Sequence, residues 1–333
     1  MFKPIVQGIA AALALAAQPP AAEEVTRLTG TRGEPALLVR HAPADGPSVL
    51  YIHGATFPSG LSVAYRIDGR SWMDDLHERG FDVWAFDFAG FGGSDRPAAP
   101  YRGDAEDSVR EIERVVRHIL RQSGRKRLAL IAHSRGSLPA GMFAARHPEL
   151  VERLVLFGPV ALRHGPAEPV PANPTLPVTV EDQSNSFRSG VPDRESVIAP
   201  ERFEAWARDY LASDPASGSR TPPAVLVPSG PQRDLAAAWA GGYPYDPAAI
   251  RAPTLIVRGE WDSITTDADA AWLVARLSGV PGGARDVKLP RGAHRMHLET
   301  NRQALFDAVG AFLADLRPAD RTATTPRGTP PHR

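Results

Sequence analysis

The chain has 333 residues, 43% of them hydrophobic and 23% charged, which is the composition of a soluble globular protein long enough for one large α/β domain with an insertion. Lysine plus arginine equals aspartate plus glutamate at 38 each, and no basic stripe with interleaved aromatic residues occurs, so no nucleic acid partner is expected. The sequence has no cysteine, which excludes disulfides, thiolate metal sites and cysteine nucleophiles, and its histidines lack metalloprotease spacing; no metal and no cofactor is expected.

The amino-terminal residues have the pattern of a targeting segment. One lysine precedes an apolar run that reaches Ala17, and small residues near its end suit cleavage, so residues 1–23 are predicted to be a signal peptide. The run is short for a bilayer, and no stable membrane span is expected. We therefore expect export to the periplasm or the medium; the alternative is a disordered or helical extension of a cytoplasmic protein.

Residues 24–162 are predicted to form the first part of a core α/β domain, because apolar strands alternate with helices. The alternation implies parallel pairing with right-handed crossovers, which places ligands at the carboxyl ends of the strands. The expected strands cover 25–30, 36–41, 48–52, 82–87, 128–132 and 151–157, and the expected helices cover 69–79, 104–121 and the residues from Gly136 onward.

Two loops in this half are interpreted as structural. His53 follows the strand over 48–52, and we interpret it as a residue that hydrogen-bonds the loop and not as a proton carrier. The glycine-rich segment 88–95 has neither the Gly-Lys-Ser of a phosphate loop nor a Gly-x-Gly-x-x-Gly that opens a helix. A phosphate-binding role is therefore disfavoured.

The segment around Ser134 is the one with the clearest chemical meaning. A buried strand ends just before it and a packed helix begins just after it, so the serine lies in a very short turn at the carboxyl edge of the sheet. Such a turn needs small residues two positions before and after the serine, here Ala132 and Gly136. The helix directs its first N–H groups toward charge that develops on a substrate oxygen. Ala-x-Ser-x-Gly also occurs by chance in turns without a catalytic role.

This segment resembles the nucleophile elbow Gly-x-Ser-x-Gly of the α/β-hydrolase family, with Ala132 in place of the first glycine. The resemblance implies a mostly parallel central sheet flanked by helices, with a cap inserted after the sixth strand. It also implies that Ser134 is the nucleophile and that the backbone N–H groups of Ala55 and Arg135 form the oxyanion hole. Haloalkane dehalogenases and epoxide hydrolases place an aspartate at the elbow, so those two chemistries are disfavoured.

Residues 163–250 are interpreted as this cap, mainly helical and irregular. Proline is dense, no convincing strand is present, and two short helices are expected, one around 235–240 and one with Phe203, Trp206 and Tyr210 on one face. The aromatic residues could line an acyl or alkyl pocket. For at least half of them we prefer the interpretation that they form the cap's own small core.

Residues 251–317 are predicted to complete the core domain. A strand over 252–257 leads into Gly259 and Asp262, which resembles the segment where the family keeps its triad acid, whereas Glu260 falls too early in the turn. Two further acids, Asp267 and Asp269, are predicted to lie in the first turn of a helix.

A last strand is expected over 286–290, and the loop after it matches the position of the family's catalytic histidine at His294. His297 is the competitor, nearer the start of a terminal helix expected from about Glu299. The tail over 318–333 is rich in proline, threonine and arginine, and it is expected to be disordered.

Serine, acid and histidine occur in the chain order of the family. We therefore expect a serine esterase in which Ser134 attacks the acyl carbon, His294 moves the proton and Asp262 orients His294. The expected partner is a small, moderately apolar ester; oligomeric state stays open. The same triad could serve a carbon-carbon bond, a lactone, an amide or cofactor-free perhydrolysis, and a third possibility is a non-catalytic binding protein on the same fold.

Overall fold

The computed structural model describes residues 22–31, 33–167, 169–314 and 316. Its main feature is an eight-stranded sheet with the order β1-β2-β4-β3-β5-β6-β9-β10. The pairs β1–β2 and β2–β4 are antiparallel and the other pairs are parallel, so the predicted mostly parallel sheet is confirmed. The strands are β1 Glu24–Leu28, β2 Leu37–Ala42, β3 Ser48–Ile52, β4 Asp82–Phe86, β5 Leu128–His133, β6 Val151–Phe157, β9 Thr254–Gly259 and β10 Arg285–Leu289.

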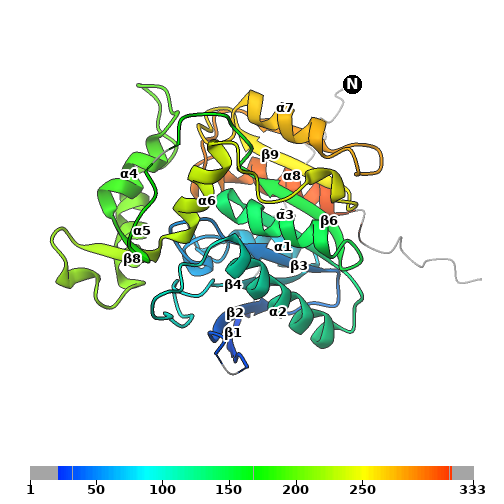
Figure 1. Cartoon of the computed structure of the whole chain (residues 1–333), viewed down its shortest axis with the longest axis horizontal. Coiled ribbons are helices and arrows are strands. Elements are labelled where there is room, and N and C mark those ends of the chain that lie inside the picture. Colours follow the sequence, from blue (N-terminus) through cyan, green and yellow to red (C-terminus); the bar gives the residue numbers. More distant parts are fainter. Residues whose placement is uncertain (1–21, 32, 168, 315, 317–333) are drawn as a thin grey trace, which may run out of the picture.

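Helices cover both faces of this sheet (Figure 1), because successive residues of a strand point to opposite sides. In β5, Leu130 and Ala132 pack in the core cluster that includes residues of α2, α3 and α7, whereas Ala129 and Ile131 pack in the cluster with residues of α1 and α8. The strand β5, which ends just before Ser134, is therefore buried on both sides. The helices are α1 Trp72–Glu78, α2 Ala105–Ser123, α3 Ser137–Arg146, α7 Asp267–Arg276 and α8 Arg302–Ala314.

Local side-chain caps define several of these helix ends. The Asp104 carboxylate accepts a hydrogen bond from the Asp107 N–H at the start of α2, and Gly124 ends that helix in the left-handed region with φ 67°. Thr266 and Asp269 form a capping box at the start of α7. The prediction that Asp269 belongs to a first helical turn is thereby confirmed.

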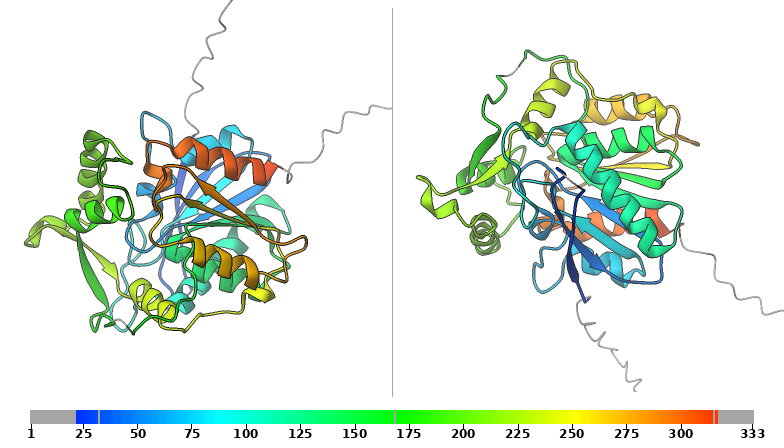
Figure 2. Two further views of the ribbon diagram at one scale, coloured as in Figure 1. Left: turned by 90° about the horizontal axis from the view of Figure 1, so that it is seen from above. Right: turned by 60° about the horizontal axis from the view of Figure 1, so that its bottom comes forward.

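Between β6 and β9 the chain leaves the sheet and forms an insertion that stands at one side of it (Figures 1 and 2). Two of its helices were predicted, and the structure adds α4 and a two-stranded antiparallel sheet of β7 and β8 where no strand was expected. The sequence pattern did not indicate these strands because each contains a proline: Pro177 lies inside β7 and Pro228 ends β8. A two-stranded sheet has free edges, where the missing N–H of proline removes no ladder bond. The elements are β7 Thr175–Thr179, α4 Val180–Arg188, α5 Pro200–Ala212, β8 Ala224–Pro228 and α6 Gly230–Trp239.

The aromatic residues of the insertion pack mainly on one another. Trp206 stacks on Tyr210 with ring centroids 5.2 Å apart, and Phe187 meets Trp206 edge-on at 5.4 Å. Trp206 also contacts Phe57 of the core domain at 5.3 Å. These rings form a small core of the insertion and join it to the rest of the molecule.

Two predicted segments fall outside the described residues, namely the signal peptide except for its last two residues and the tail over 318–333. Among the helices of the described chain, none combines the length and the apolar character needed to cross a membrane.

Candidate active site

Ser134 lies in the sharp turn between β5 and α3 that the sequence predicts. Its φ of 55° is in the left-handed region, which costs free energy for a residue with a Cβ atom and must be held by its surroundings. The turn was predicted to need a small residue two positions after the serine, and the surroundings of Gly136 give the reason. A Cβ atom at Gly136 would lie 2.4 Å from the backbone oxygen of His53. The turn can therefore pack against the loop after β3 only with glycine at this position.

His294 bridges Ser134 and Asp262. Its Nε2 atom lies 2.7 Å from Oγ of Ser134, and its Nδ1 atom lies 3.0 and 3.1 Å from the two carboxylate oxygens of Asp262. Because a carboxylate only accepts hydrogen bonds, the Nδ1–H donates to Asp262 and Nε2 is left to accept the serine hydroxyl proton. All three side chains are buried at the carboxyl edge of the sheet, with residue exposures of 8% for Ser134, 7% for His294 and 5% for Asp262.

Asp262 is held in its ionised form by its neighbours. Burial alone would raise the pKa of this carboxyl, but His294 and the N–H groups of Thr265 and Ile264 outweigh that effect, and the pKa lies below the ordinary value. Oδ1 accepts both N–H groups, at 3.0 Å from Thr265 and 2.8 Å from Ile264. The carboxylate is thus fixed beside the imidazole.

The competing residues lie elsewhere. His297 places Nε2 3.2 Å from Oγ of Ser62, and burial followed by the charge of Arg295 lowers its pKa well below the ordinary value. The buried, neutral ring of His297 is hydrogen-bonded to Ser62, and in the described structure no hydrogen bond joins it to Ser134. Glu260 accepts the N–H of Arg291 at 2.9 Å. The structure brings His294 and Asp262 together with Ser134, and neither competitor joins them.

The loop after β3 lies directly against the elbow. A Cβ atom on Gly54 would stand 3.2 Å from Cβ of Ser134, so the loop packs closely on the serine at this residue. His53 has the structural role that the sequence predicts: Nε2 accepts the N–H of Phe88 at 3.0 Å and Nδ1 donates to the Gly54 oxygen at 2.8 Å. Burial lowers the pKa of His53 to about 4, so it stays neutral at neutral pH.

Gly158 is a site residue that the sequence analysis missed. It follows β6 with φ 54°, and a Cβ atom there would lie 3.0 Å from Oδ2 of Asp262 and 3.1 Å from Nδ1 of His294. The absence of a side chain makes room for Asp262 and His294. A glycine directly after a buried strand at the carboxyl edge was the available signal.

The residues that follow the serine and the histidine both reach into the insertion. The buried Arg135 guanidinium donates to Asp234 of α6 and, at 2.8 Å each, to Oγ of Ser108 and the oxygen of Gly103. The Arg295 guanidinium donates to Oε1 of Gln183 in α4 at 2.9 Å. The insertion is therefore joined to the core domain at two points, one next to Ser134 and one next to His294.

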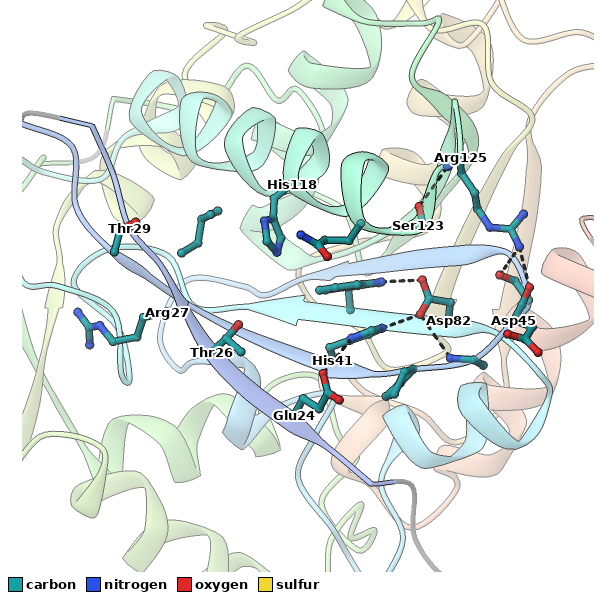
Figure 3. A pocket seen from close by; sticks show the side chains of 16 residues that line it. Glu24, Thr26, Arg27, Thr29, His41, Asp45, Asp82, His118, Ser123 and Arg125 are labelled. Atoms are coloured by element: carbon teal, nitrogen blue, oxygen red, sulfur yellow. Dashed lines mark hydrogen bonds and ion pairs between the residues drawn. The ribbon is translucent and has the colours of Figure 1, made fainter.

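A separate pocket of about 770 Å³ lies near the amino ends of β3 and β4, at the opposite edge of the sheet (Figure 3). Its central carboxylate, Asp82, accepts hydrogen bonds from His41 at 2.6 Å, Ser48 at 2.7 Å and the Trp84 indole at 2.8 Å. These contacts tie three strands together and leave the carboxylate satisfied. Across the part of the chain that the structure describes, no group of three or more histidine or acidic side chains is arranged to hold a metal ion.

Comparison with known proteins agrees with this architecture. The model of a family described as alpha/beta hydrolase fold matches residues 47–300. Epoxide hydrolase 3 of Xenopus tropicalis is 26% identical in an alignment of 274 positions that covers 74% of this chain and 66% of that protein, so the chain spans slightly less than two thirds of this relative. A laboratory-evolved variant of potato epoxide hydrolase StEH1 has a TM-score of 0.63 with 15% identity, covering 88% of this chain and all of the other. The thioesterase domain from the curacin biosynthetic pathway has a TM-score of 0.61 with 18% identity, covering 88% and 99%. At these identities the two structures share the fold alone.

Proposed function

The chain belongs to the alpha/beta hydrolase fold family, and from the contacts among Ser134, His294 and Asp262 we propose that it is a serine hydrolase that cleaves a carboxylic ester through an acyl-enzyme intermediate. One observation carries the proposal: Nε2 of a single histidine lies 2.7 Å from the serine oxygen while its Nδ1 faces a buried carboxylate. A serine hydroxyl is unreactive at neutral pH unless such a base takes its proton.

In the proposed reaction, His294 Nε2 accepts the hydroxyl proton as Oγ of Ser134 attacks the ester carbonyl carbon. The imidazolium then gives that proton to the leaving alcohol, and the acyl group stays on the serine. A water molecule, deprotonated by His294, attacks the acyl carbon and releases the acid and the free serine. Asp262 keeps the imidazole in the required tautomer and stabilises its positive charge.

The tetrahedral intermediates carry a negative oxygen, for which we propose the N–H groups of Ala55 and Arg135 as donors. The close approach of Gly54 to Ser134 supports the first donor, and the place of Arg135 at the start of the elbow helix supports the second. Removing one such donor costs about 3 kcal/mol of transition-state stabilisation in serine hydrolysis.

We also propose that residues 163–250 act as a cap that selects the substrate. The contacts of Arg135 with α6 and of Arg295 with α4 support this role, because they connect the insertion to residues adjacent to the nucleophile and the base. The aromatic content of the insertion favours a moderately apolar ester.

The presence of serine at the elbow argues against the chemistry named for the epoxide hydrolase relatives, which, as the family resemblance implies, begins from an aspartate. The proposal is tested with p-nitrophenyl esters and a fluorophosphonate probe. Wild type should hydrolyse the ester and take up one probe per chain, and Ser134→Ala should do neither while unfolding at a similar temperature. Turnover or labelling that persists in Ser134→Ala would remove the assignment.

The same triad could act on a carbon-carbon bond, a lactone or an amide, or catalyse perhydrolysis. A substrate panel separates these reactions, since each gives a different product from the same serine. Uptake of the probe by Ser134 without turnover of any ester would favour one of them over the esterase proposal.

A further inference from the structure

The backbone on both sides of His294 is held by one buried side chain. Glu299 is fully buried, and its two carboxylate oxygens accept different N–H groups: Oε2 binds Ala293 at 2.8 Å and Oε1 binds Arg295 at 3.0 Å. These two N–H groups flank His294. A single carboxylate thus fixes the peptide units before and after the base.

The carbonyl group of His294 is held from the other side of the site. Nε2 of His133 lies 2.9 Å from the carbonyl oxygen of His294, and burial, followed by the neighbouring His297 and His294, keeps the His133 ring neutral by lowering its pKa well below the ordinary value. His133 immediately precedes Ser134 in the elbow. The base is therefore anchored to Glu299 through its flanking N–H groups and to the nucleophile turn through its carbonyl.

The arrangement matters because the imidazole must meet two partners at once. Nε2 of His294 lies 2.7 Å from the Ser134 oxygen while Nδ1 lies 3.0 Å from Asp262. A rotation of the His294 backbone moves the ring relative to both partners, and a displacement of about 1 Å can cost roughly 100-fold in rate. A side chain that fixes this backbone affects catalysis without contacting the substrate.

We propose that Glu299 is a positioning residue for His294, which holds the N–H groups of Ala293 and Arg295 so that the imidazole faces the Ser134 hydroxyl. This inference rests on the proposed function for its catalytic consequence. Its structural part, the restraint on the loop, can be measured without turnover.

Glu111 in α2 offers a matched control outside the His294 loop. It is also a buried glutamate with two donors, the Ala89 N–H at 3.0 Å and the Tyr101 hydroxyl at 2.7 Å. These two donors belong to residues outside the His294 loop, so in the described structure no hydrogen bond joins the Glu111 carboxyl group to that loop. Glu111→Gln therefore changes a buried carboxyl group in the same way without removing an acceptor from the N–H groups beside His294.

The experiment compares wild type, Glu299→Gln and Glu111→Gln in the full-length protein. Glutamine has one acceptor oxygen and an NH₂ group, so at position 299 one of the two N–H groups loses its acceptor. Amide hydrogen exchange in the peptide that contains Ala293 and Arg295 should accelerate about tenfold or more in Glu299→Gln. It should stay at the wild-type rate in Glu111→Gln.

Turnover is then measured per active site, with sites counted by the fluorophosphonate probe. For Glu299→Gln, kcat should fall by roughly 10- to 100-fold while KM changes less than about threefold, because the loss concerns the base and not substrate binding. Glu111→Gln should keep kcat within about twofold of wild type.

Unchanged exchange in Glu299→Gln overturns the inference whatever the turnover. So does a kcat per active site that matches wild type, or an equal loss in Glu111→Gln. A wild-type protein that neither labels nor hydrolyses esters would contradict the proposed function, and in that case accelerated exchange in Glu299→Gln would still support the restraint on the loop.

Discussion

Oγ of Ser134 lies 2.7 Å from Nε2 of His294, although 160 positions separate the two residues in the chain. The distance is that of a hydrogen bond. The sheet achieves it by placing the ends of β5 and β10 at the same edge, so the fold itself brings the proposed nucleophile and base together. Such preorganisation lowers the entropic cost of the chemical step.

Replacement of His294 is expected to have a far greater effect than replacement of His297. His294→Ala should lower kcat for a p-nitrophenyl ester by about 1,000-fold or more, because it removes the group that accepts the serine proton. His297→Ala should lower kcat by less than about tenfold, since that ring bonds Ser62. Initial rates of variants with wild-type circular dichroism provide the measurement, and the reverse order would mean that the base is assigned to the wrong histidine.

A methyl group at position 158 should disturb the proposed acid and base. In Gly158→Ala the new Cβ atom would lie 3.0 Å from Oδ2 of Asp262, so kcat should fall by roughly 100-fold as the pair shifts. Gly124→Ala is the matched control, because Gly124 has a similar positive φ and a Cβ atom there meets nothing within 4 Å. The control should lose stability from the backbone strain alone and keep its kcat; equal rates in the two variants would contradict the role given to Gly158.

Loss of the Asp234 carboxylate should destabilise the protein strongly. Asp234→Ala leaves the Arg135 guanidinium, which is 1% exposed, without its ionic partner, and removing one member of a buried pair costs about 3–5 kcal/mol. Glu106→Ala breaks an ion pair with Arg146 whose side chains are half exposed, and it should cost less than about 1 kcal/mol. Urea unfolding measures the free energy of unfolding of both variants. Similar losses would show that the buried Arg135–Asp234 pair contributes no more to stability than the exposed pair.

The stability of the protein should carry a pH dependence that originates at Glu111. Burial raises the pKa of this carboxyl from 4.5 to about 7 in the folded state, whereas the unfolded chain releases the proton near 4.5. Between these two values the folded state binds more proton at Glu111, so the contribution of this carboxyl to the free energy of unfolding falls as the pH rises, by up to about 3 kcal/mol, and levels off above pH 7.

Glu111→Gln removes this contribution. The difference in unfolding free energy between wild type and variant should therefore shift in favour of the variant between pH 4.5 and 7, as determined by urea titration across that range. A difference that stays constant with pH would refute the raised pKa.

The sequence predicted the parts of the structure that depend on local patterns. The strands over 48–52 and 151–157 have the predicted bounds because continuous apolar runs between turn residues leave little choice. The resemblance at the elbow led to His294 and Asp262, which the fold brings together with Ser134.

What escaped prediction depends on contacts between distant residues. The strand pair β7–β8 was missed because its prolines oppose the usual strand pattern, and only the pairing itself makes them tolerable. Glu299 carries no local signal of its role, since it acts through backbone N–H groups of a loop. The signal for Gly158, a glycine directly after a buried strand, does not indicate that its lack of a side chain leaves room for Asp262 and His294. Such roles become visible only when the loops after β6, β9 and β10 are seen side by side.

The position of β10 at the end of the sheet order, paired with β9, also bears on how the protein is made. Domains form from the amino terminus during synthesis, so the turn with the serine leaves the ribosome long before the loop with the histidine. A nascent chain, or one cut short before that loop, would expose an ordinary alcohol and attack nothing. The proposed reactivity would thus begin only after the segment with β10 and His294 has been synthesised and has joined the sheet.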